Sequence, residues 1–222
     1  MGPLATGLTG ERVKITEIFH SLQGEAQFSG LATVFVRLTG CPLRCQYCDT
    51  AYAFHGGEWW TVPDILARVA RFQTRDVCVT GGEPLAQRSC LGLLAALCDQ
   101  GHRVSLETSG ALKFDAVDPR VLRVVDVKTP GSGEVERNLY RQLAALRPEE
   151  QIKFVITSRA DYEWSRAKVR ELALAERCGV LFSPSFGQIE PRALADWLLA
   201  DRLPVRLQIQ LHKLLWGDER GR

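Results

Sequence analysis

Three cysteines lie within eight residues, in the segment CPLRCQYC that contains Cys41, Cys45 and Cys48. Three thiolates at this spacing, on a loop that leaves a strand, can ligate three irons of a cubane iron–sulfur cluster and leave the fourth iron open. The alternative is a zinc site completed by His55 or by a distant residue. A zinc site would favour a fourth ligand at a regular spacing, often in a second Cys-x-x-Cys, and the sequence contains none. The spacing therefore favours an iron–sulfur cluster.

A second candidate segment, Thr80-Gly81-Gly82-Glu83-Pro84, follows a short apolar run. Paired glycines let a backbone approach a ligand closely, and the Glu83 carboxylate can accept hydrogen bonds from an ammonium group. Gly-Gly turns are also common in ordinary loops. The segment therefore becomes specific only in combination with the three cysteines.

Arg37 stands in the otherwise apolar run VFVRL. A buried arginine is rare unless it is paired, so its position calls for a partner. The guanidinium fork suits the carboxylate of a small-molecule ligand. The alternative is a structural ion pair with a buried acid.

Alternating strands and helices must position these residues. We expect strands at Val13–Phe19, Ala32–Leu38, Asp76–Thr80, Arg103–Glu107, Leu122–Val127, Ile152–Ile156, Val180–Phe182 and Val205–Ile209. We expect helices from Thr61, over Ala86–Gln100, over Glu136–Leu146, from Ser158 to about Arg177, and over Pro191–Ala200. This alternation predicts a parallel sheet with right-handed crossovers.

Small and polar residues recur just after the expected strands, at the edge where parallel α/β folds bind their ligands. The sheet is short for a closed barrel. We therefore predict an α/β fold with one domain over residues 1–222, an open, incomplete (β/α) barrel of parallel strands. Residues 1–12 are expected to form a flexible N-terminal tail, and residues 217–222 a C-terminal tail.

The composition narrows the class of protein. Of 222 residues, 45% are apolar and 24% are charged, which argues against a disordered chain, a collagen or a coiled coil. The net charge of +2 gives no reason to propose nucleic acid or a membrane as a partner. Seven cysteines without a visible secretory signal favour a cytoplasmic protein rather than a disulfide framework. The cysteines outside the cluster segment are interpreted as buried small hydrophobes: Cys78, Cys90, Cys98 and Cys178.

The two motifs together resemble those of radical S-adenosylmethionine enzymes. In that superfamily the open iron chelates the methionyl amino and carboxylate groups, and the Gly-Gly-Glu-Pro segment meets the same amino group. The segments SLQGEAQFSG, FVRLTGCPLRCQYCDT, VTGGEPL and LETSG, with a histidine and a lysine near the C-terminus, narrow the resemblance. Over about Ile15 to Trp216 the chain resembles the 7-carboxy-7-deazaguanine synthase family.

This resemblance implies a ring contraction of 6-carboxy-5,6,7,8-tetrahydropterin to 7-carboxy-7-deazaguanine with loss of ammonia, in queuosine and 7-deazapurine biosynthesis. A reduced [4Fe-4S] cluster would cleave S-adenosylmethionine to a 5′-deoxyadenosyl radical, which takes a hydrogen from C6 of the pterin. The hydrogen is returned, so S-adenosylmethionine acts as a true cofactor. The resemblance also implies Mg²⁺, an electron donor such as flavodoxin or ferredoxin, and a homodimer.

The resemblance assigns a role to each matching residue. Cys41, Cys45 and Cys48 would hold the cluster, and Thr50 would bind Mg²⁺. The S-adenosylmethionine site would comprise Tyr47, Cys48, Asp49, Gly82, Glu83, Ser109, Asp126, Lys128, Ser183, Pro184, Ser185 and Phe186. The pterin site would comprise Leu22, Gln23, Gly24, Glu25, Arg37, Thr80 and His212.

Simpler interpretations stand beside these assignments. Glu25 could be a solvated carboxylate, Thr50 a turn residue, and His212 a surface histidine on the last strand or the tail. Relatives that end sooner can place the terminal carboxylate at the substrate, and the longer tail here puts that role in doubt. Two other functions share part of the pattern: an activating enzyme for a glycyl-radical partner, and a zinc-binding adaptor without catalysis.

Overall fold

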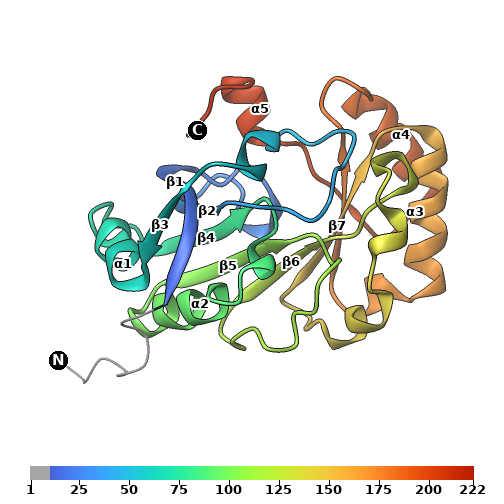
Figure 1. Cartoon of the computed structure of the whole chain (residues 1–222). Helices are drawn as coiled ribbons and strands as arrows, with labels where there is room; N and C mark the ends of the chain where they lie inside the picture. The colour runs from blue at the N-terminus through green and yellow to red at the C-terminus, as the bar shows by residue number, and fades with distance from the viewer. Residues whose placement is uncertain (1–10) are drawn as a thin grey trace.

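Nine strands form one open sheet in the computed structural model, which describes residues 11–222 (Figure 1). The strands are β1 (Arg12–Leu22), β2 (Ala32–Leu38), β3 (Glu58–Thr61), β4 (Asp76–Gly81), β5 (Arg103–Thr108), β6 (Leu122–Asp126), β7 (Gln151–Ile156), β8 (Gly179–Pro184) and β9 (Arg206–Leu207). The α-helices are α1 (Val62–Ala70), α2 (Cys90–Asp99), α3 (Arg159–Glu171), α4 (Pro191–Asp201) and α5 (Leu211–Trp216). None of the helices in this part of the chain has the length and apolar character that a membrane crossing requires.

The strand order is β3-β1-β2-β4-β5-β6-β7-β8-β9, and all pairs from β2 to β9 are parallel. The two end strands, β3 and β9, do not pair with each other, so the predicted open, incomplete (β/α) barrel is confirmed. The prediction was wrong for the first strand, because β1 runs antiparallel to both β2 and β3. The short connection between β1 and β2 cannot hold the crossover that a parallel pair needs.

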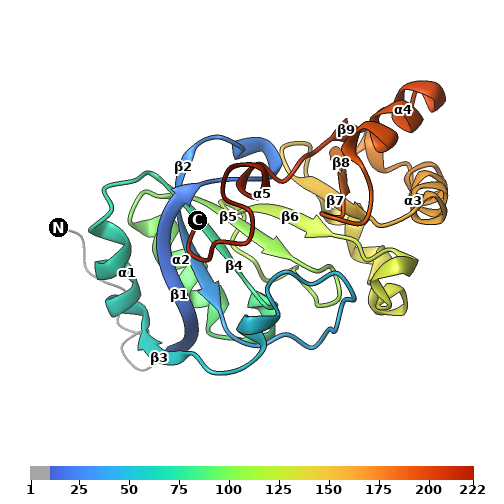
Figure 2. The same cartoon turned by 90° about the horizontal axis from the view of Figure 1, so that it is seen from above.

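Alternation along the parallel strands separates a hydrophobic core from a polar inner face. On β2, Val34 and Val36 are fully buried in the core that the strands share with α1 to α4, whereas Arg37 faces the other way. The same two-residue period on β7 puts Ile152 and Phe154 in the core and Lys153 on the inner face. Figures 1 and 2 show α5 and the C-terminus lying over one edge of the sheet.

Helix α1 begins at the expected residue, whereas α2 begins later than expected. The Thr61 side chain accepts a hydrogen bond from the Asp64 backbone nitrogen, so α1 begins as expected. The second expected helix begins four residues late, because Pro84–Ala86 forms a separate 3-10 turn whose first backbone donor is bound by Glu83. The third strand of the structure, β3, is not among the strands that we expected.

The expected helix over Glu136–Leu146 is absent, and two 3-10 turns, Val135–Arg137 and Tyr140–Ala145, replace it. Asn138 separates them: its side chain accepts from the Lys128 backbone nitrogen and donates to the Lys128 carbonyl. Such side-chain bonds to a distant backbone compete with helix formation.

Three further boundaries differ from the expectations. Helix α3 ends at Glu171 rather than near Arg177, because Ala173 adopts a left-handed conformation with φ of 48°. The last strand is reduced to Arg206–Leu207. Arg12 pairs with Thr61, so a flexible tail reaching residue 12 was wrong, and the expected tail otherwise lies outside the described residues.

Candidate active site

A cavity of about 480 Å³ opens at the carboxyl ends of the parallel strands. Five neighbouring strands, β2, β4, β5, β6 and β7, each contribute one polar side chain from the inner face: Arg37, Thr80, Glu107, Asp126 and Lys153. The sequence-predicted residues that line the cavity are Leu22, Gln23, Gly24, Glu25, Arg37, Cys41, Cys45, Tyr47, Cys48, Asp49, Thr50, Thr80, Gly82, Ser109, Asp126, Lys128, Ser185, Phe186 and His212. Glu83, Ser183 and Pro184 are not among the residues that line it.

The cysteine loop, residues 39–50, is fixed to the end of β4 through backbone hydrogen bonds. The Gly82 nitrogen donates to the Leu38 carbonyl at 3.1 Å, and the Glu83 nitrogen donates to the Gly40 carbonyl at 2.8 Å. A side chain on Gly82 would overlap the Gly40 carbonyl and lie 2.8 Å from the Cys41 Cβ atom. The glycine pair therefore lets two protein backbones approach each other, whatever ligand it also meets.

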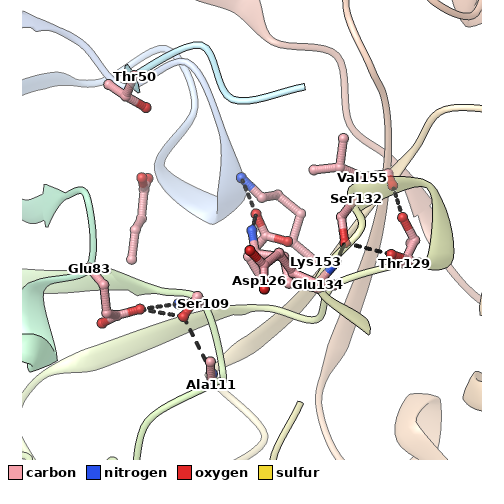
Figure 3. Close-up of polar contacts among 12 residues, drawn as sticks. Thr50, Glu83, Ser109, Ala111, Asp126, Thr129, Ser132, Glu134, Lys153 and Val155 are labelled. Atoms are coloured by element: carbon pink, nitrogen blue, oxygen red, sulfur yellow. Dashed lines mark hydrogen bonds and ion pairs between the residues drawn. The ribbon is translucent and has the colours of Figure 1, made fainter. Parts of the chain in front are cut away.

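A second loop, residues 129–134, supports the cysteine loop from the other side. The Gln46 nitrogen donates to the Ser132 carbonyl at 3.0 Å, and the Arg44 nitrogen donates to the Glu134 carboxylate. Asp161, in the first turn of α3, accepts from the Gly131 nitrogen at 2.8 Å and from the Thr129 hydroxyl at 3.1 Å. Figure 3 shows Thr129, Ser132 and Glu134 together in this loop beside Val155.

The three thiols of Cys41, Cys45 and Cys48 are free and half-buried, and all three line the cavity. Burial raises the pKa of Cys45 to about 11, so metal binding must displace its proton. Within residues 11–222, no group of three His, Cys, Asp or Glu side chains is placed to hold a single metal ion. His55 does not line the cavity. Three free thiols at one cavity wall match the donor set of a cubane cluster, in which each thiolate binds a separate iron.

Glu83 is fully buried, and its carboxylate is bonded to protein donors. It accepts from the Thr108 hydroxyl at 2.8 Å, the Ser109 nitrogen at 2.7 Å and the Leu85 nitrogen at 3.0 Å. Figure 3 shows the bonds between Glu83 and Ser109. The Glu83 carboxylate therefore links the end of β4 to the end of β5. This link holds Ser109 at the cavity wall.

Arg37 forms a structural ion pair and also keeps part of its guanidinium group free to bind a ligand. Its Nε atom lies 2.7 Å from the Glu17 carboxylate, which also accepts from the Tyr52 hydroxyl at 2.8 Å. Among the described residues, no hydrogen bond involves the two terminal guanidinium nitrogens of Arg37. An ion pair therefore holds the side chain by one edge, and the fork remains available to the cavity.

Glu107 lies at the cavity floor between two predicted pterin-site residues. Its carboxylate accepts from the Gln23 amide at 3.3 Å and from the Thr80 hydroxyl at 3.1 Å. The segment LETSG indicated this region, but no role followed for Glu107 from the sequence.

A chain of opposite charges crosses the cavity from Glu25 to Lys128. Lys153 Nζ lies 2.5 Å from Glu25 and 3.7 Å from Asp126, and Lys128 Nζ lies 3.0 Å from Asp126. Burial alone would raise the pKa of Glu25, but the charge and hydrogen bond of Lys153 lower it to about 2. Glu25 is thus a buried, paired carboxylate rather than a solvated one.

Lys153 was missed by the sequence reasoning. The signal that singled out Arg37, a cation in an otherwise apolar strand, is also present at Lys153 in the run QIKFVI. Burial alone would lower its pKa, but the carboxylates of Glu25 and Asp126 raise that pKa well above its ordinary value. The two carboxylates therefore favour the protonated, cationic form of Lys153.

The C-terminal segment closes one side of the cavity. His212 lies on α5, not on a last strand, and it packs where a side chain on Gly24 would stand. The Leu211 nitrogen donates to the Gly24 carbonyl at 3.0 Å. Residues 217–222 also line the cavity, and the Arg220 guanidinium lies 4.2 Å from the centre of the Tyr52 ring.

Thr50 follows the three cysteines in the chain and lines the same cavity as the C-terminal residues 217–222. Its hydroxyl donates to the Asp49 carboxylate at 2.9 Å, and the Lys213 ammonium lies 4.0 Å from the same carboxylate. The Thr50 oxygen therefore faces a site with both a carboxylate and a cation nearby.

Comparisons with known proteins agree with this geometry. Residues 35–130 match the Radical SAM superfamily. The chain is 48% identical to 7-carboxy-7-deazaguanine synthase from Chlorobaculum tepidum, over 94% of this chain and 97% of the relative. It is 40% identical to the enzyme of the same name from Koribacter versatilis, over 93% and 98% of the two chains. The crystal structure of QueE from Escherichia coli superposes with a TM-score of 0.75 at 26% identity, over 90% of this chain and 95% of that one. The chain therefore belongs to the 7-carboxy-7-deazaguanine synthase family of the radical SAM superfamily.

Proposed function

We propose that this chain converts 6-carboxy-5,6,7,8-tetrahydropterin to 7-carboxy-7-deazaguanine with loss of ammonia, as a step of queuosine and 7-deazapurine biosynthesis. The observation that carries the proposal is that one cavity holds both the three thiols and the segment Leu22-Gln23-Gly24-Glu25 with Arg37. A cysteine loop alone would fit any radical SAM enzyme. The polar set on the inner face supplies donors and acceptors for a carboxylated pterin.

Membership of the superfamily implies a [4Fe-4S] cluster and S-adenosylmethionine, and the residues at the cysteine end of the cavity fit both. Cys41, Cys45 and Cys48 would hold the cluster. Nine of the residues that we assign to S-adenosylmethionine line the cavity: Tyr47, Cys48, Asp49, Gly82, Ser109, Asp126, Lys128, Ser185 and Phe186. When bound, these groups supply the radical chemistry, and the protein supplies positioning and exclusion of water.

The opposite end of the cavity would bind the pterin. The free fork of Arg37 can donate two parallel hydrogen bonds to the substrate carboxylate. Glu25 can accept from the amino and ring N–H groups of the aminopyrimidine, and Gln23 and Thr80 can complete the polar edge. His212 would close over the ring from α5.

We also propose a Mg²⁺ ion at Thr50. Mg²⁺ prefers oxygen ligands and keeps several waters, so one hydroxyl, oxygens of the substrate and water would complete its ligand set. Thr50 lies two residues after Cys48 and lines the cavity. The cysteine loop would then present the cluster and the metal on one braced segment.

The remaining parts of the proposal concern partners. An electron donor of the flavodoxin or ferredoxin type would reduce the cluster, and the chain would act as a cytoplasmic homodimer without nucleic acid or membrane as partners. A glycyl-radical activating enzyme would have to admit a segment of another protein into its site. Here residues 217–222 line the cavity, which favours a small substrate.

The direct test is anaerobic incubation of the iron-loaded protein with S-adenosylmethionine, a reductant and the carboxypterin, followed by mass spectrometry. We expect 7-carboxy-7-deazaguanine and ammonia in equal amounts. A 6-methyl-tetrahydropterin, which lacks the carboxylate, should give neither. Reductive cleavage of S-adenosylmethionine without any deazaguanine would contradict the proposal.

A further inference from the structure

Lys153 lies at the boundary between the two ends of the cavity. It stands in the middle of β7, directly beside Asp126 of β6 in the sheet register. Its ammonium contacts one carboxylate from each end, Glu25 on the pterin side and Asp126 on the S-adenosylmethionine side. Figure 3 shows Lys153 and Asp126 next to each other.

The two contacts are unequal. Lys153 Nζ is 2.5 Å from Glu25 and 3.7 Å from Asp126, and Asp126 has a second cation, Lys128, at 3.0 Å. Glu25 has Lys153 as its ion-pair partner among the described residues, while its other oxygen accepts from the Gln210 amide at 2.8 Å. Removal of Lys153 would therefore leave Glu25 without an ion-pair partner and leave Asp126 paired.

We propose that Lys153 is a positioning residue that keeps Glu25 ionised and aimed at the aminopyrimidine of the substrate; this rests on the proposed function. A carboxylate offers about four acceptor positions, and the structure uses one on each Glu25 oxygen. The free positions can accept the two donors that an aminopyrimidine presents side by side. A protonated carboxyl group would lose this match, because one oxygen would become a donor.

Burial makes Glu25 depend on its partner. The carboxyl group lies within the fold, and Lys153 contributes the largest of the effects that hold its pKa low. The Gln210 hydrogen bond and the charge of His212 lower that pKa further by smaller amounts, whereas Glu107 and Asp126 at the same cavity carry negative charge. A buried carboxyl group without a cation takes up a proton at higher pH than an exposed one. Loss of Lys153 should therefore weaken pterin binding most at low pH.

The test compares Lys153→Met and Lys153→Arg with Lys168→Met as a matched control. Lys168 is also a half-buried, ion-paired lysine, but it lies on α3 with Glu171 and away from the cavity. The probe is 6-carboxypterin, a stable analogue with the same aminopyrimidine, titrated anaerobically into iron-loaded protein that is saturated with S-adenosylmethionine. Its Kd is measured by fluorescence from pH 6.0 to 7.5, with KM and kcat for the tetrahydropterin measured alongside.

We expect the Kd of wild type and Lys168→Met to stay nearly constant over this pH range. In Lys153→Met the Kd should rise about 10- to 100-fold at pH 6.0, the effect of losing a hydrogen bond to a charged group, and should recover as the pH increases. Lys153→Arg should restore most of the affinity and the flat pH profile. Where Lys153→Met fails to fold, Lys153→Gln serves instead, because it removes the charge and keeps a donor.

A uniform loss at all pH values, or an equal loss of affinity for S-adenosylmethionine, would make Lys153 merely structural and overturn the inference. So would a Kd within twofold of wild type in the variant without the charge. The proposed function has a separate readout, since wild type must also turn over the tetrahydropterin. Binding of 6-carboxypterin without turnover would reject the proposed function, and the comparison of Kd values would still decide the role of Lys153.

Discussion

Replacing Arg37 by lysine keeps a positive charge at the cavity wall and removes the planar fork that carries it. In the structure the Nε edge of Arg37 is bonded to Glu17, and the two terminal nitrogens are free of protein partners within the described residues. A lysine has one ammonium group at this place. It can remain with Glu17 or turn to the substrate carboxylate, but it cannot bond both with the geometry of the fork.

The expected magnitude follows from the hydrogen bonds lost. A hydrogen bond to a charged group contributes about 1.5–3 kcal/mol, and the lysine variant loses at least one such bond to the substrate carboxylate. Since about 1.4 kcal/mol corresponds to a factor of ten, the KM for the carboxypterin should rise roughly 10- to 150-fold. Affinity for S-adenosylmethionine should change little, because Arg37 lines the part of the cavity that we propose to bind the pterin.

The assay is steady-state turnover with varied carboxypterin, with the Kd for S-adenosylmethionine measured separately. Arg103→Lys provides the matched control, since Arg103 pairs with Asp76 at the opposite end of the strands and does not line the cavity. Its KM should equal that of wild type. Equal weakening of both ligands by Arg37→Lys, or a lower Tm with an unchanged KM, would refute a substrate-binding fork and leave only the ion pair with Glu17.

Three other outcomes are expected. Cys45→Ala should lose the iron–sulfur absorbance and most bound iron, whereas Cys98→Ala should keep both at a packing cost of about 1 kcal/mol; full iron content in the first variant would reject the cluster assignment. Turnover should fall when Mg²⁺ is removed, and Thr50→Ala should blunt that response while Thr50→Ser keeps much of it; identical Mg²⁺ titrations in all three proteins would remove Thr50 from the metal site. Truncation after Gly217 should increase the 5′-deoxyadenosine released per product, because residues 217–222 line the cavity and help exclude water; an unchanged ratio would show that the chain end has no such role.

Local apolar patterning was sufficient to predict the strands that carry the site. The apolar runs that form β2 and β4 are recognisable from their own residues and are buried in the sheet. The positions of these strands, and of the motifs that follow them, were therefore predicted correctly. Both the strands and the cysteine spacing depend on residues that are close in sequence, so both can be predicted without knowledge of distant contacts.

The features that the sequence did not predict depend on distant partners. The direction of β1 is decided by its pairing with β2 and β3, and the break in the Glu136–Leu146 segment by bonds between Asn138 and Lys128. The bonds of Glu83 to Thr108 and Ser109 likewise join residues 25 and 26 positions apart along the chain.

Lys153 is a further residue whose role depends on a distant partner. Its strand was predicted, but its partner Glu25 is 128 positions away along the chain. Glu25 lies in the connection between β1 and β2, and three strands, β4, β5 and β6, separate β2 from β7 in the sheet. The contact therefore forms only in the folded chain. A polar residue inside an apolar strand is thus a useful signal for a cavity, although it cannot identify the partner.

The fate of a deuterium at C6 of the carboxypterin tests the ring contraction most directly. The protein should convert C6-deuterated substrate to 7-carboxy-7-deazaguanine over many turnovers for each S-adenosylmethionine consumed. The deuterium should pass through S-adenosylmethionine, because the proposed reaction returns the hydrogen removed from C6 before the cofactor is released. Stoichiometric 5′-deoxyadenosine that carries the deuterium, with no deazaguanine formed, would contradict both the reaction and the role assigned to this cavity.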